Sequence, residues 1–222
     1  MTKMTDWLVL IPTEFERRYL TLFSELESTT VKVCGFGPIV SAAKTAEFIG
    51  VYQPKRVMLL GIAGSYRAES VGGLHPGAAA IFSDVACFGV GVGAGENYET
   101  AGEMGWQQWG AADDDPIGDV IQLNDRLGFL KRFQERQLLT VCAASGNKED
   151  VSKRLRKFPN AAAEDMEGFA VATACQFFRK PLVIIRGISN LAGDREKSNW
   201  KIEEALASAQ SLAVEIIRNV GN

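Results

Sequence analysis

Six short aliphatic runs, separated by helical patterns, constrain the fold of this chain more than any other feature. The runs are rich in β-branched and aliphatic residues, which is typical of strands, and they are WLVLI (7–11), VKVCGF (31–36), RVMLLGIA (56–63), AAAIFSDVACF (78–88), LLTVCAA (138–144) and LVIIRGIS (182–189). Apolar patterning between and after them predicts helices over 14–26, 39–52, 166–178 and 200–220. This alternation predicts an α/β sandwich around a largely buried sheet.

Composition and charge narrow the class of partner. A chain of 222 residues with 46% hydrophobic residues can fill one core, so residues 1–222 are predicted to form a single domain. Its formal net charge is −3 and its 24 basic residues are scattered, which disfavours nucleic acid and favours a small-molecule partner. The run WLVLIP lacks a basic leader and no later run could span a bilayer, so we expect a cytoplasmic protein without a membrane partner.

The cysteines and the one histidine argue against a metal centre. Cys34, Cys87, Cys142 and Cys175 lie far apart in apolar stretches without a CxxC pair. We therefore expect buried free thiols in place of disulfides or a zinc site. His75 lies in the sequence GLHPG, which predicts an exposed turn and leaves no histidine cluster for a metal.

Two glycine-rich segments follow predicted strands. Gly35 and Gly37 stand where a dinucleotide-binding turn would begin, but Val40 occupies the third glycine position and YQPKR replaces the ribose-binding acid. A dinucleotide-dependent oxidoreductase is therefore disfavoured. Gly61 and Gly64 fit either a tight turn or a place where a ligand approaches the backbone, and composition does not separate these alternatives.

Polar residues accumulate at two further places, each with a simple structural interpretation. Glu164, Asp165 and Glu167 precede an almost wholly apolar helix, where acids usually form a solvated cap. Asn190 follows a buried strand and either closes a turn or binds a ligand. Residues 89–119 carry little regular pattern and fit a substrate-covering loop or an ordinary surface excursion equally well.

Taken together, five segments resemble the nucleoside phosphorylase and nucleosidase superfamily over essentially the whole chain. They are IPTEFER, CGFGPIVSAA, GIAGSY, EDMEG and RGISN, in the superfamily's order. The details PTEFE, SNLAGDR and Trp200-x-Ile202 are similar to the futalosine hydrolase family. The resemblance implies a three-layer α/β/α sandwich with a central mixed sheet, N-glycosidic hydrolysis of a purine nucleoside without cofactor or metal, and a homo-oligomer, with a dimer favoured, in which a neighbouring subunit completes the pocket.

The resemblance also assigns roles to residues. The water-activating glutamate falls on Glu16, with Glu14 as the weaker candidate, and the ribose-binding glutamate falls on Glu167, with Met166 beneath the sugar. Thr13 and the acids beside it would repel phosphate, which favours hydrolysis over phosphorolysis. Five residues are expected along the pocket wall, and they are Ala63, Gly64, Ala144, Ser145 and Asp165. Phe36 and residues 89–106 are further candidates.

Asn190 is the informative departure, because adenine-cleaving members of the superfamily have an aspartate there. An amide can donate to O6 of hypoxanthine and accept from N7–H, whereas an ionised carboxylate would face O6 with lone pairs. Asn190 thus predicts a 6-oxopurine as the leaving base. It cannot itself supply a proton, so Asp194 is a possible helper.

For futalosine, whose 5′ substituent carries a benzoate, the mouth of the pocket should hold aromatic or cationic groups, and Tyr98, Trp106 and Arg195 are the candidates. Two alternatives stay open. One is a methylthioadenosine or S-adenosylhomocysteine nucleosidase that tolerates Asn190, and the other is a catalytically silent nucleoside-binding protein.

Overall fold

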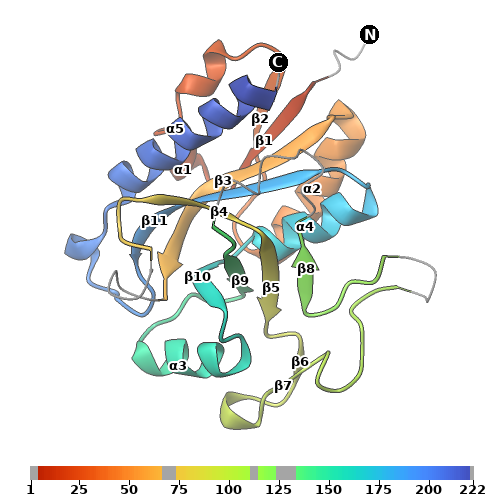
Figure 1. Ribbon diagram of the computed structural model, residues 1–222, viewed down its shortest axis with the longest axis vertical. Helices are drawn as coiled ribbons and strands as arrows, with labels where there is room; N and C mark the ends of the chain where they lie inside the picture. Colours follow the sequence, from red (N-terminus) through yellow and green to blue (C-terminus); the bar gives the residue numbers. More distant parts are fainter. Residues whose placement is uncertain (1–4, 67–73, 111–114, 124–133, 221–222) are drawn as a thin grey trace.

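A nine-stranded mixed sheet forms the centre of the computed structural model, which describes residues 5–66, 74–110, 115–123 and 134–220 (Figure 1). The strand order is β2-β1-β3-β10-β9-β5-β8, and β11 pairs with both β3 and β4. The strands are β1 (Trp7–Ile11), β2 (Thr29–Val33), β3 (Arg56–Ser65), β4 (Ala79–Phe82), β5 (Asp84–Phe88), β8 (Val120–Gln122), β9 (Gln137–Val141), β10 (Ala161–Asp165) and β11 (Leu182–Leu191). Parallel pairs join β1, β2, β3 and β11, whereas β4 and β8 run antiparallel to their partners.

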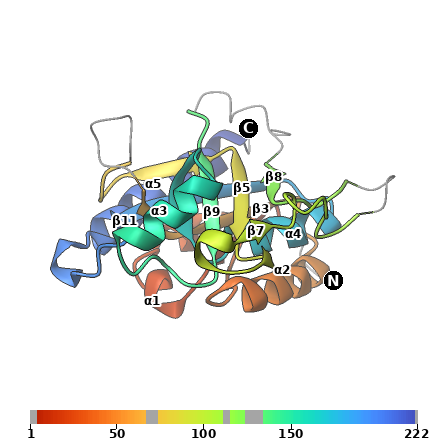
Figure 2. The same cartoon turned by 90° about the horizontal axis from the view of Figure 1, so that it is seen from below.

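Helices cover both faces of this sheet. The helices α2 (Pro38–Tyr52) and α4 (Gly168–Phe177) pack together on one face, and α5 (Ile202–Val220) covers β11 and β3 on the other (Figure 1). The short helix α1 (Glu14–Arg17) follows β1, and α3 (Lys148–Lys157) lies in front of the sheet in the view from below (Figure 2). Buried aliphatic side chains form separate clusters on the two faces. The predicted three-layer α/β/α sandwich with a mixed sheet is therefore confirmed.

The N-terminal helix differs from the prediction over 14–26. It ends at Arg17, and only a 3₁₀ turn (Leu22–Glu25) follows it. The apolar residues do not share one buried face: Phe15 and Leu22 are exposed, while Leu20 and Phe23 are buried. The periodic pattern was thus not the stripe of a single helix.

Two other differences concern strands. The run 78–88 breaks at Ser83 into β4 and β5, which join different neighbours, β11 and β9. The strand β10 was not predicted, because its sequence AAAED has low strand propensity, and its pairing with β9 and β3 creates it. Glu164 and Asp165 therefore end a strand and are not a solvated helix cap, and α4 begins at Gly168, not at Met166.

Two strands, β1 and β10, pair with different parts of the same edge of the long strand β3, and the sheet is open between them. The strand β11 pairs along one edge, whereas β1 pairs with the other only as far as Leu59 and β10 pairs with it from Gly64. Gly61 lies in the gap, where an added Cβ would overlap Arg186 Nη1 and lie 2.7 Å from Glu16 Oε1. Gly61 therefore lies within a strand and not in a tight turn, and it is needed because side chains of the protein itself approach its backbone closely.

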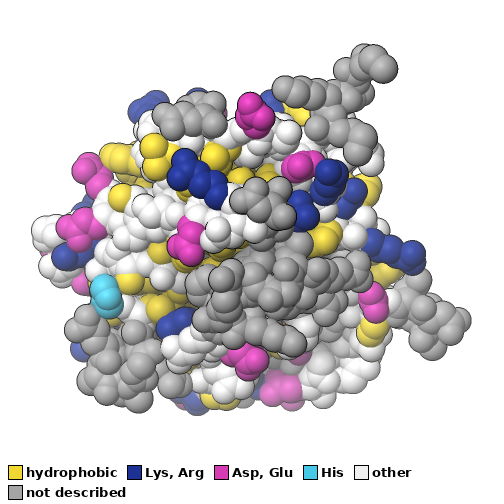
Figure 3. Space-filling view, turned by 45° about the horizontal axis from the view of Figure 1, so that its top comes forward, with side chains coloured by type: hydrophobic (Ala, Val, Ile, Leu, Met, Phe, Trp, Pro, Cys, Tyr) yellow, Lys and Arg dark blue, Asp and Glu magenta, His cyan; other side chains and the backbone are white. Residues whose placement is uncertain are grey.

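Surface features follow the composition. Figure 3 shows basic and acidic side chains intermixed on the visible face, without a basic stripe. The four cysteines are free as expected, but only Cys34 and Cys175 are buried, and Cys142 is exposed because it follows the last residue of β9. His75 is exposed in its turn, as predicted. In the described part of the chain, no helix has the length and apolar character that crossing a membrane would require.

Candidate active site

A cavity of about 400 Å³ lies where the sheet opens, beside the ends of β1, β3, β10 and β11. All nine residues that the sequence assigned to a site line this cavity: Glu16, Ala63, Gly64, Ala144, Ser145, Asp165, Met166, Glu167 and Asn190. The weaker candidate Phe36 lines it as well. The nine residues come from five segments that are distant in the sequence, and these meet at one place because the strand ends come together there.

Glu16 is held rigidly at the start of α1. Thr13 is the N-cap residue: its hydroxyl accepts from the Glu16 N–H at 3.2 Å and donates to Glu16 Oε2 at 2.6 Å. The N–H of Ile62, left without a strand partner in the gap of β3, donates to Glu16 Oε1 at 3.0 Å. Glu14 instead is exposed and bonded to Arg17 at 2.6 Å. The geometry therefore separates the two acids, and only Glu16 reaches the cavity.

Glu167 joins three of the sequence motifs. The backbone N–H of Gly37 donates to its Oε1 at 3.0 Å, and Arg186 Nη2 donates to its Oε2 at 3.1 Å. The pKa of Glu167 is raised to about 7, mainly by burial and also by the neighbouring Asp165, against the lowering effect of Arg186 and of the Gly37 N–H. Glu167 therefore changes charge close to neutral pH.

Asp165 has a structural position within the cavity wall. It binds Arg186 Nη2, accepts from the Thr140 hydroxyl at 2.7 Å and accepts from the Gly168 N–H at 2.8 Å. These three donors tie β9, α4 and β11 to the end of β10. Its oxygens are thus occupied by protein groups, and it fixes the guanidinium that contacts Glu167.

Asn190 lies near the end of β11, just after a shift in the register between β11 and β3. Such irregularities redirect side chains at functional sites. The Ser189 hydroxyl donates to Asn190 Oδ1 at 2.7 Å, and Asn190 Nδ2 donates to the Leu191 carbonyl at 2.7 Å. These bonds determine which atom of the Asn190 amide is the oxygen and which is the nitrogen. They leave one N–H of Nδ2 and one lone pair of Oδ1 for another partner.

The residues expected at the mouth behave differently from one another. Arg195 lines the cavity and its guanidinium lies 5.1 Å from the ring centroid of Trp200. Tyr98 is buried, and its hydroxyl bonds to the backbone of Gly89 and Val90. Trp106 is exposed, and no described residue of 89–119 lines this cavity. Within one chain, the described part of this segment therefore does not line the cavity.

Asp194 does not fit the role of a proton donor. It is only partly exposed, and it lies outside the cavity lining. Its pKa is lowered, mainly by the hydrogen bond from the Asn199 amide and also by the Glu196 N–H. An acid with a lowered pKa is ionised at neutral pH and has no proton to give.

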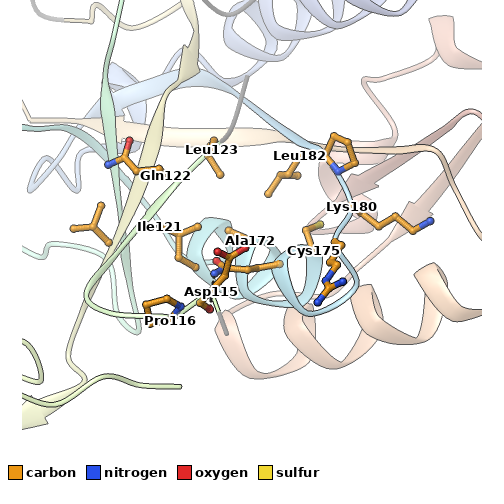
Figure 4. A pocket seen from close by; sticks show the side chains of 13 residues that line it. Asp115, Pro116, Ile121, Gln122, Leu123, Ala172, Cys175, Lys180 and Leu182 are labelled. Carbon is orange, nitrogen blue, oxygen red and sulfur yellow. Dashed lines mark hydrogen bonds between the residues drawn. The ribbon is translucent and has the colours of Figure 1, made fainter. Parts of the chain in front are cut away.

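A second cavity, of about 280 Å³, lies between β8 and the end of α4 (Figure 4). Its wall includes Cys175 and Gln122 and none of the predicted site residues. Among the residues that the structure describes, no group of three or more His, Cys, Asp or Glu side chains is arranged to hold a metal ion.

Known proteins resemble this chain in sequence and in fold. The 5′-methylthioadenosine/S-adenosylhomocysteine nucleosidase of Colwellia psychrerythraea is 29% identical over 195 residues, which cover 84% of this chain and 75% of that protein. Futalosine hydrolase of Streptomyces coelicolor is 37% identical over 71 residues, or 32% of this chain and 30% of that protein. The native structure of futalosine hydrolase from Helicobacter pylori shares the fold, with a TM-score of 0.75 at 16% identity over 97% of this chain and 98% of that chain.

One family model describes nearly the whole chain. The model of the phosphorylase superfamily matches residues 6–220, from β1 to the end of α5. The match includes every segment that contributes to the cavity at the opening of the sheet. The chain therefore belongs to the phosphorylase superfamily.

Proposed function

We propose that this protein hydrolyses the N-glycosidic bond of a 6-oxopurine nucleoside, with futalosine as the substrate and hypoxanthine and dehypoxanthine futalosine as the products. The observation that supports this most is Asn190, which shares a cavity with Glu16 and Glu167 and has its amide orientation fixed by Ser189 and Leu191. Relatives that carry the names nucleosidase and hydrolase support the reaction type.

In the proposed mechanism the two ends of the breaking bond are stabilised separately. As the C1′–N9 bond stretches, the ribose gains positive charge and the base gains negative charge. Glu167 accepts hydrogen bonds from the ribose hydroxyls, and Glu16 takes a proton from the water whose oxygen bonds to C1′. The base leaves with the electron pair of the C1′–N9 bond, is stabilised by Asn190, and takes up its proton from water. Thr13 and the buried Glu16 occupy the place where a phosphorylase would need cationic groups, which favours water over phosphate.

The outer part of the cavity supports a substrate with a long 5′ substituent. Phe15, Trp200 and Ile202 line both the cavity and an adjoining open groove of about 750 Å³. Arg195 lines the cavity beside Trp200, and Lys197 and Lys201 line the groove together with Glu203 and Glu204, of which Glu204 pairs with Lys201 at 3.2 Å. Aromatic side chains can stack on a benzoate ring, and the cations can pair with its carboxylate.

A substrate panel tests this proposal against the adenine-specific alternative. We expect the protein to release base from futalosine in preference to methylthioadenosine. In Asn190→Asp, an ionised carboxylate facing O6 should shift that preference toward adenine by roughly 10- to 100-fold, because an unpaired buried polar group costs on the order of 1–3 kcal/mol. The readout is kcat/KM for each nucleoside from the rate of free-base release. Preferential adenine release by the wild type would contradict the assignment, and binding without release would indicate a silent binding protein.

The pKa of Glu167 predicts the pH dependence of activity. Above pH 7 the carboxylate is ionised and accepts from the ribose hydroxyls, and below about pH 7 the added proton removes that charge. We therefore expect kcat/KM to fall by about tenfold per pH unit on the acid side of neutrality. Glu167→Gln should have lower activity and should lose this acid limb. An identical acid limb in the wild type and the variant would assign the titration to another group.

We also propose that a second copy of the chain covers the face formed by α2 and α4. Phe36 and Ile39 at the start of α2 are exposed there, and Ile39 is 84% exposed. Phe177 is exposed at the end of α4, and Trp109 is exposed beside it. Their ring centroids are 5.4 Å apart. Exposed apolar side chains on one face are typical of subunit interfaces, and Phe36 also lines the cavity, so a partner at the start of α2 lies beside the site.

Solution mass tests this interface. Sedimentation velocity should give twice the 24.1 kDa of one chain. Ile39→Glu, which places a charge on the proposed interface, should give the mass of a single chain. A single-chain mass for the wild type at micromolar concentration would contradict the proposal.

A further inference from the structure

The wall of the same cavity carries a buried carboxylate, Glu164, that the mechanism above does not use. Three groups donate to its Oε2: the Tyr66 hydroxyl at 2.8 Å, the Ser145 hydroxyl at 2.7 Å and Arg154 Nη1 at 2.6 Å. The Ser145 N–H donates to its Oε1 at 2.7 Å. Because four donors point at this carboxylate, both of its oxygens act as acceptors and neither presents a proton.

The two oxygens of Glu164 differ in how many further hydrogen bonds they can accept. Each carboxylate oxygen can accept about two hydrogen bonds. Among the residues that the structure describes, Oε2 has three donors, whereas Oε1 has one, the Ser145 N–H. One acceptor position is therefore open at Oε1, and the Ser145 N–H, the donor that the backbone would otherwise offer a ligand, is already used. This part of the cavity wall accepts hydrogen bonds and does not donate them.

We propose that Glu164 determines base specificity by accepting a hydrogen bond from N1–H of a 6-oxopurine. Hypoxanthine carries a donor at N1, whereas adenine has a lone pair there that would face the Glu164 lone pair. This inference rests on the proposed function and adds the far edge of the six-membered ring to the O6 and N7 contacts of Asn190, which lines the same cavity. Arg154, Tyr66 and Ser145 are positioning residues for the carboxylate.

The buried setting makes the conservative substitution informative. In Glu164→Gln, the three donors at the Oε2 position should outweigh the single Ser145 N–H at the Oε1 position, so the amide oxygen stays with the three donors and the amide nitrogen takes the Oε1 position and offers a donor. A donor there repels N1–H of hypoxanthine and matches the N1 lone pair of adenine. We expect the ratio of the adenine Kd to the hypoxanthine Kd, measured by titration calorimetry with the free bases, to fall by roughly 10- to 100-fold. With Asn190→Asp in the same chain, the two changes should approximately multiply.

Two further variants separate specificity from structural damage. Tyr66→Phe removes one donor to Oε2 and leaves Oε1 in place, so it should lower the melting temperature but keep the wild-type base ratio. Arg154→Met combined with Glu164→Gln removes both charges of the buried pair and avoids an unpaired cation if the single variant does not fold. The same fall in ratio is expected in this pair.

The outcomes distinguish this inference from the proposed function. A wild-type base ratio in folded Glu164→Gln, or an equal shift in Tyr66→Phe, would overturn the role of Glu164. Base discrimination that depends on Glu164 would support the inference even if no nucleoside releases its base. That second result would refute only the hydrolytic proposal.

Discussion

Glu16→Gln should lower kcat for release of hypoxanthine from futalosine by about 10²- to 10⁴-fold, the usual contribution of a general base. The glutamine retains an oxygen to accept from the Ile62 N–H and an amide to bond with Thr13, so its place at the start of α1 is preserved. What it loses is the ability to take a proton from water. KM should change far less than kcat, because the substrate contacts of Glu167 and Asn190 remain.

The same helix provides a matched control. Glu14 is two residues away, carries the same charge and is exposed in an ion pair with Arg17. Glu14→Gln should therefore keep wild-type turnover, and steady-state kinetics with both variants on one nucleoside makes the comparison direct. Wild-type turnover in Glu16→Gln, or a large loss in Glu14→Gln, would refute the assignment of the base.

The sequence predicted which residues line the cavity where a residue type is demanded by its place in the fold. Gly61 admits no side chain beside Arg186 and Glu16, and Gly37 supplies a backbone N–H to Glu167. Such positions leave short motifs in the sequence. The motifs follow the strands, and the ends of parallel strands meet at one edge of a sheet, so the site could be anticipated without its contacts.

The part of the cavity wall around Glu164 could not be predicted in the same way. Arg154 belongs to α3, whose polar sequence KEDVSKRLRK is typical of an exposed helix, and yet its guanidinium is buried against Glu164. Tyr66 and Ser145 reach the same carboxylate from 98 and 19 residues away in the sequence. No local pattern encodes such a contact. The strand β10, which presents Glu164, was missed for the related reason that its neighbours, and not its own residues, make it a strand.

Arg186→Met should cause the largest loss of stability of any single substitution at this site. The guanidinium is completely buried, and it binds Asp165 and also Glu167 at 3.1 Å. Removing it leaves two buried carboxylates without their cation, which typically costs about 3–5 kcal/mol of a total stability of about 5–15 kcal/mol. For a chain of this length, we expect the melting temperature to fall by roughly 6–20 °C.

Thermal unfolding of three matched variants tests whether the charge balance is the cause. Arg17→Met removes an exposed arginine that pairs with Glu14 at 2.6 Å, and it should change the free energy of unfolding by less than about 1 kcal/mol. Asp165→Asn combined with Arg186→Met removes one charge of each sign, so it should recover part of the lost stability. Arg186→Met could have the same melting temperature as the wild type, or the double variant could be no more stable than Arg186→Met. Either result would show that the buried carboxylates do not need this cation for stability. The expected recovery follows from the arrangement of the cavity, in which one arginine balances the acids that hold the ribose side of the site together.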